Sequence, residues 1–222
     1  MKKILLVGML STILVLPISA GAVTYDLTIS NVLTPDLYGH VTISQVDATT
    51  VKFLVDLDDS KLNPVSNYGI DKFFFNTTIS PLQPVEHWLF GGVPASDWDI
   101  QSFDSGEAGF DTFSIQYKGS GSSRFEPLEF ELQYFENLSG SGTHQDPYVR
   151  TGSAKNIFVS DFDVANSDGN HVLVHVGGID VQGQGSAFLS DGPTPVPEPG
   201  TMMLLGSGLA GLAGWGRKKF RK

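Results

Sequence analysis

Two glutamates, Glu129 and Glu131, are the side chains of this sequence whose spacing best suits acid–base chemistry. They alternate with Leu128, Phe130 and Leu132. A glycosidase needs an acid and a second carboxylate that face each other across the bond it cleaves. Two residues apart on a strand, both would point the same way, with Cα atoms about 7 Å apart. The pair therefore fits the polar face of a sheet equally well, and a polysaccharide-acting glycosidase or lyase is kept as an alternative.

Oxygen ligands around a tight turn form a candidate calcium site. They are Asp161, Asp163, Asp168 and Asn170, and calcium prefers oxygen ligands of these kinds. The spacing is not that of an EF-hand, and ordinary solvated turns explain the same residues. Calcium is the only cofactor that the sequence suggests.

Other catalytic or metal-binding signatures do not occur in the chain. The motifs H-E-x-x-H, G-x-S-x-G and G-x-x-x-x-G-K-[ST] are missing, and the absence of cysteine excludes disulfides and a thiol nucleophile. His171 and His175 would share a zinc ion on a helix, but on a strand they lie roughly 13 Å apart. We therefore expect a protein that is not an enzyme.

Aromatic rings could instead bind sugars by stacking. Trp88, Trp98, Tyr38 and Tyr68 lie in turn-rich surroundings. The competing interpretation is that these rings fill the core, which is the more common role of a tryptophan in a domain of this size. A carbohydrate-binding module is the first alternative to a structural or adhesive role.

β-Strands are the elements that must position all of these side chains, because apolar residues recur in the body with a period of two. In residues 50–57 the apolar positions alternate with polar ones, as a half-buried antiparallel strand requires. Further strands are expected at residues 25–29, 40–45, 70–76, 98–103, 113–117, 125–134, 154–163 and 171–179. Many short strands separated by turns predict an all-β fold, namely an antiparallel β-sandwich of jelly-roll type.

The body between the two ends of the chain is strongly acidic. Half of the 14 lysines and arginines lie in the terminal segments, so the mature chain, counting Glu198 of the stalk, has 7 basic against 24 acidic residues and a net charge near −17. Such a charge repels nucleic acid, which is not an expected partner. Roughly 175 residues suffice for one core, so a single β-sandwich ectodomain is predicted at residues 23–190.

The amino terminus has the form of a secretory signal peptide. Two lysines precede the apolar run at residues 4–16, and Ala20-Gly21-Ala22 supplies the small residues that a signal peptidase reads. Residues 1–22 are therefore the predicted signal peptide, with an apolar helix. Cleavage is expected after Ala22, or as a second choice after Ala20.

Three features follow one another at the carboxyl terminus. A proline-rich stalk at residues 191–200 contains Pro197-Glu198-Pro199, and residues 201–222 comprise an apolar, glycine-rich helix and a basic end. The basic residues are Arg217, Lys218, Lys219, Arg221 and Lys222. The apolar segment is short for a hydrocarbon core of about 30 Å, but snorkelling basic side chains would let residues 201–216 span the membrane with the basic end in the cytoplasm.

This three-part tail resembles the PEP-CTERM sorting tail of proteins exported by Gram-negative bacteria. The resemblance implies that exosortase, a membrane-bound cysteine transpeptidase, recognises Pro197 to Pro199 and removes the tail. It also implies an inner-membrane intermediate, followed by delivery to the cell surface or extracellular space of a cell that makes exopolysaccharide. The expected function is a structural or adhesive protein of the cell surface or extracellular matrix, with exosortase and exopolysaccharide as its partners.

Overall fold

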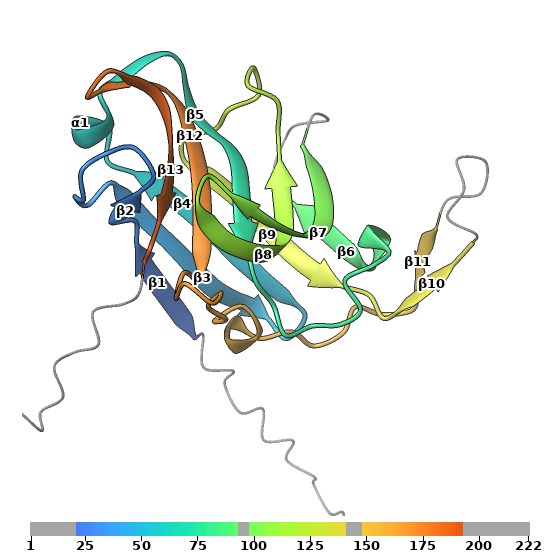
Figure 1. The fold of residues 1–222 in the computed structure, drawn as a ribbon. Coiled ribbons are helices and arrows are strands. Elements are labelled where there is room, and N and C mark those ends of the chain that lie inside the picture. The colour runs from blue at the N-terminus through green and yellow to red at the C-terminus, as the bar shows by residue number, and fades with distance from the viewer. Residues whose placement is uncertain (1–20, 93–97, 141–147, 193–222) are drawn as a thin grey trace, which may run out of the picture.

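Two antiparallel β-sheets make up the body of the protein (Figure 1). The computed structural model describes residues 21–92, 98–140 and 148–192. The predicted signal helix and tail helix, with Ala20, the sorting motif and the basic cluster, lie outside the described residues. Within these residues, no helix is long and apolar enough to cross a membrane. The predicted all-β class with antiparallel sheets is confirmed, and the jelly-roll topology stays a prediction.

The strands divide into a five-stranded sheet and a six-stranded sheet. The five-stranded sheet has the order β1 (Ala22–Asp26), β3 (Gly39–Asp47), β4 (Thr50–Leu57), β9 (Leu128–Tyr134) and β6 (Trp88–Gly91). The six-stranded sheet has the order β2 (Ile29–Ser30), β13 (Gln184–Ser190), β12 (Val172–Val181), β5 (Pro64–Phe75), β8 (Phe110–Lys118) and β7 (Asp99–Glu107). A small arm of β10 (Asn137–Ser139) and β11 (Val149–Thr151) projects from the body (Figure 1). Three short helices complete the described elements: α1 (Asp59–Leu62), η1 (Val85–His87) and η2 (Val159–Asp161).

Phenylalanine rings from both sheets meet in a common core. The ring centroid of Phe53 in β4 lies 4.9 Å from that of Phe130 in β9 and 5.1 Å from that of Phe75 in β5. Phe162, from the segment before β12, closes the group at 5.4 Å from Phe53. All four residues are fully buried. The sheets therefore pack face to face as in a β-sandwich, with the alternating apolar residues turned inward.

The strand predicted at residues 154–163 is wrong. This segment is irregular and ends in η2. The Asp161 carboxylate accepts hydrogen bonds from the Phe158 N–H at 2.8 Å and the Thr78 hydroxyl at 3.3 Å, and the Asp161 N–H donates to the Phe158 carbonyl. These local contacts satisfy polar groups that a strand would pair with a neighbour.

A second, smaller apolar cluster lies on the outer face of the six-stranded sheet. Phe74 belongs to it, whereas its neighbours Phe73 and Phe75 belong to the main core, so the two clusters occupy opposite faces. The register of β7 and β8 shifts twice, and the end of this hairpin curls across the outer face (Figure 1). Phe113 of the hairpin is buried against Phe74, and the ring of Phe110 is partly covered.

Candidate functional site

A polar cluster surrounds Asp71 on the same outer face. In the pairing of β5 with β12, Lys72 lies opposite His175 and Ile70 lies opposite Val176, so Asp71 is the extra residue of a β-bulge. A bulge changes the direction of the side chains on the strand that carries it. Here Asp71 and Lys72 both fall between the core residues Ile70 and Phe73, and Asp71 contacts the outward-facing His175.

The Asp71 carboxylate joins two basic side chains. It forms a hydrogen bond with His175 Nδ1, and its other oxygen accepts from Arg124 Nε at 2.8 Å. Arg124 Nη1 also donates to the Asn67 carbonyl at 2.8 Å. Asp71 is only 6% exposed. Burial alone would raise the pKa of this carboxyl, but the hydrogen bonds and charges of His175 and Arg124 outweigh burial and lower it.

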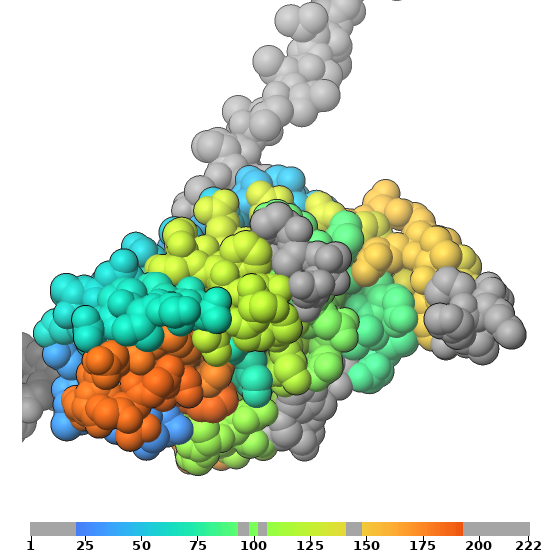
Figure 2. Space-filling view, turned by 90° about the horizontal axis from the view of Figure 1, so that it is seen from above, coloured from blue at the N-terminus to red at the C-terminus, as the bar shows by residue number. Residues whose placement is uncertain are grey.

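Gly177 leaves room for the Arg124 guanidinium. A Cβ atom at this position would lie 2.3 Å from the central guanidinium carbon. A side chain at position 177 would therefore overlap the guanidinium unless Arg124 moved. Such a movement would break the hydrogen bonds of Arg124 to Asp71 and to the Asn67 carbonyl. Figure 2 shows the segments concerned side by side at the surface: β5 in teal, the chain before β9 in yellow-green, and β12 and β13 in orange.

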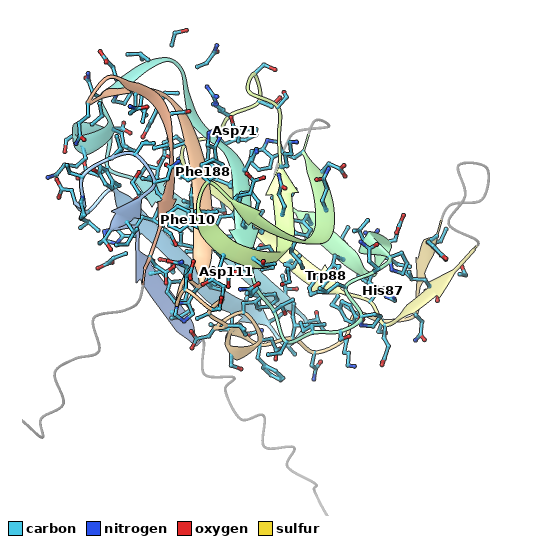
Figure 3. All side chains as sticks on the ribbon, in the orientation of Figure 1. Asp71, His87, Trp88, Phe110, Asp111 and Phe188 are labelled. Atoms are coloured by element: carbon cyan, nitrogen blue, oxygen red, sulfur yellow. The ribbon has the colours of Figure 1, made fainter. Side chains whose placement is uncertain are left out.

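Aromatic and charged side chains extend the cluster toward the β7–β8 hairpin. The ring of Phe188 in β13 lies 4.5 Å from the His175 ring, and Lys72 Nζ lies 5.7 Å from the Phe188 centroid. Lys72 also approaches Glu107 at 3.8 Å. Figure 3 shows Asp71, Phe188 and Phe110 along this part of the body, with Trp88 well apart from them. Hydrogen-bonding groups and a partly exposed ring thus occur together on one face.

The two glutamates at positions 129 and 131 lie on the solvent face of the other sheet. Both are exposed, and Glu129 forms an ion pair with Lys52 at 2.7 Å. Glu131 lies opposite the same Lys52 in the register of β4 and β9. The carboxylates therefore belong to a charged sheet surface, which was the alternative to a glycosidase pair.

Three of the four predicted calcium ligands, Asp161, Asp163 and Asn170, have separate hydrogen-bond partners. Asp161 caps its own turn, as described above, and Asp163 accepts a hydrogen bond from the Tyr25 hydroxyl at 2.6 Å. Buried Asn170 accepts from the Ser190 hydroxyl at 3.0 Å. In the part of the chain that the structure describes, no three acidic or histidine side chains could hold a metal ion together. Calcium binding at these residues stays a prediction.

Most of the aromatic rings considered for sugar stacking fill the core. Trp88, Trp98 and Tyr38 are buried, and the Trp98 indole N–H donates to the Ser123 carbonyl at 2.8 Å. Tyr68 is partly buried. The apolar neighbours of Trp88 in the sequence already favoured burial, whereas nothing in the sequence singled out Phe188.

A second histidine–carboxylate pair lies where the body ends. Asp191 is buried, and its carboxylate accepts from the N–H groups of His171 and Val172 at 2.9 and 3.1 Å and contacts His171 Nδ1 at 2.7 Å. The His171 ring stacks on Tyr25 of β1, with centroids 4.7 Å apart. These contacts join the first and last strands of the body and bury Asp191, the first residue of the predicted stalk, within the body.

Glu126 is a carboxyl group in an unfavourable environment. One of its oxygens accepts from the Leu57 N–H at 2.9 Å, and the other is buried without a partner. Burial raises the pKa of Glu126 to about 7; the Leu57 hydrogen bond opposes the rise, and the charges of Asp56 and Asp59 add to it.

Replacing Glu126 with glutamine should stabilise the protein selectively at high pH. The folded-state pKa is higher than the unfolded value of about 4.3, so the folded protein holds more protons between these values and loses stability as pH rises through about 7. Because the Glu126 residue is partly exposed, we expect a gain of only about 1–2 kcal/mol at pH 8, and little change at pH 4. Urea unfolding at both pH values measures the difference. The control is the exposed Glu129→Gln, and an equal offset at both pH values would contradict the prediction.

A comparison with known families identifies the tail. The family model of the PEP-CTERM protein-sorting motif matches residues 195–218. No curated protein and no solved structure matches the chain significantly. The fold and the tail together define an all-β protein with a carboxyl-terminal sorting segment. The chain carries a PEP-CTERM sorting motif, as its Pro-Glu-Pro sequence, apolar segment and basic end predicted.

Proposed function

We propose that this chain is an exported protein of the cell surface or extracellular matrix, processed by exosortase and serving there as a structural or adhesive β-sandwich. The match of the sorting motif to residues 195–218 is the observation that carries the proposal. In this proposal residues 201–216 anchor the unprocessed protein in the inner membrane. Exopolysaccharide is the partner of the protein after its export.

The position of the stalk supports this arrangement. The Asp191 contacts end the folded body immediately before Gly192, and Pro197 follows Gly192 by five residue steps along the chain. Five extended residues span at most about 17 Å. The intermediate would therefore hold the folded body close to the membrane and to the processing enzyme.

The body itself supports a role without catalysis. The carboxylate pair that could have served a glycosidase lies on an open sheet surface, where Lys52 neutralises one member. The strongly acidic body should stay soluble and unassociated with nucleic acid. Binding to polysaccharide is the alternative, and the outer face around His175 favours it, since that face combines hydrogen-bonding groups with an aromatic ring.

Intact-mass spectrometry of the protein from the native host's surface and medium tests the proposal. We expect a chain from Val23, or as a second choice from Gly21, to about Pro199. The second choice would keep all of β1, which begins at Ala22, and the hydrogen bond from the Gln45 N–H to the Gly21 carbonyl at 3.0 Å. A mass that retains the basic end would instead indicate a membrane-anchored ectodomain and overturn the processing proposal.

A further inference from the structure

We propose that the outer face of the six-stranded sheet binds a neutral, hydroxyl-rich sugar unit of a polysaccharide. The outer-face site consists of Lys72, Glu107, His175 and Phe188, with Asp71 and Arg124 behind them. This inference deepens the polysaccharide-binding alternative of the proposed function and rests on it. The proposed sugar contacts come from β5, β12, β13 and β7, and not from the buried tryptophans.

The imidazole of His175 is held in one orientation. Its Nδ1 lies on the buried Asp71 carboxylate, so Nδ1 carries a proton and Nε2 is the ring nitrogen left for a ligand. The His175 side chain is 17% exposed, and the Asp71 side chain is 8% exposed. A ligand hydroxyl can both donate and accept a hydrogen bond, so it is a suitable partner for a ring nitrogen fixed in this way.

The cluster behind His175 buries charged groups, which costs free energy. A buried ion pair seldom stabilises a fold more than well-packed apolar side chains would. Here the chain combines a bulge at Asp71, a nearly buried Asp71–Arg124 pair and a glycine at position 177 that leaves space for the guanidinium. The result of this arrangement is one oriented histidine at the surface, which is the pattern of a binding group with its supporting residues.

The neighbours of His175 indicate the class of ligand. Lys72 Nζ supplies donors and Glu107 supplies acceptors; these two side chains are 25% and 31% exposed and lie 3.8 Å apart. Their charges offset each other, and the acidic body repels anions. The Phe188 ring offers an apolar surface for the C–H groups of a sugar ring. Together these groups suit a neutral sugar better than a uronic acid or a phosphate.

Affinity electrophoresis of the protein purified from host surface or medium tests the site. The polymers are dextran, galactomannan and mixed-linkage glucan, with polygalacturonate as the anionic comparison and the host's own exopolysaccharide as a further sample. We expect retardation by at least one neutral polymer. His175→Gln and Lys72→Gln should each weaken binding at least tenfold, whereas Lys52→Gln and Glu129→Gln on the opposite sheet should leave it unchanged.

A measurement on the unaltered protein tests the site even if a variant fails to fold. The ring nitrogen resonances of His175 should shift on addition of a hexasaccharide from the polymer that retards the protein. Lack of retardation by every neutral sample, stronger retardation by polygalacturonate, or equal loss in the opposite-sheet variants would overturn the site. The intact mass is independent of this result, so a processed protein that binds no sugar would refute the site and leave the export proposal standing.

Discussion

Alanine at Pro197, Glu198 and Pro199 together is expected to abolish removal of the tail, so that the recovered protein keeps residues 200–222. Alternating prolines keep a segment extended, which is the form that a protease cleft can hold. A hydrogen bond to a charged group is worth about 1.5–3 kcal/mol, so losing the Glu198 carboxylate alone should slow processing by about 10- to 100-fold. Intact mass and membrane fractionation in the native host measure the outcome.

The matched control for the sorting motif is Pro193→Ala. It changes a proline of the same stalk that lies before the matched residues 195–218. We expect this variant to be processed like the unaltered protein. If the triple variant were released with the same carboxyl terminus as the control, the Pro-Glu-Pro segment would not be the recognised element.

Phe53→Ala should produce the largest loss of stability among single substitutions considered for the body. Phe53 is fully buried, and its ring contacts Phe73, Phe75, Phe130 and Phe162 from both sides of the core. Truncating a buried phenylalanine removes about 3–5 kcal/mol of unfolding free energy. For a domain of this size, that corresponds to a fall in Tm of about 6–20 °C. Thermal unfolding followed by circular dichroism measures the change.

The adjacent Leu54→Ala is the control for Phe53. Leu54 lies on the same strand but on its outer, partly exposed face. Its truncation should cost well under half of the loss at Phe53, because no cavity forms between the sheets. Similar losses at the two positions would mean that β4 does not turn Phe53 toward the second sheet.

The strand pattern of the body could be predicted largely from local sequence. Alternation in residues 50–57 indicated which face of β4 is buried, and Val51, Phe53 and Val55 are all fully buried. The same reasoning failed for residues 154–163, where the Asp161 carboxylate and nearby turns satisfy the backbone. An alternating pattern reports which side chains avoid water, but it does not report whether a neighbouring strand is available to pair.

The outer-face site could not have been predicted in this way. Asp71 lies 53 residues from Arg124 and 104 from His175 in the chain, and their contact depends on a bulge that appears only when β5 pairs with β12. The sorting tail is the opposite case, because its three parts are contiguous and the motif can be recognised from a linear segment. The sequence alone therefore determined the tail, the acidic charge and the all-β class. Only the tertiary structure decided which distant side chains share a face, because that depends on strand register and not on chain order.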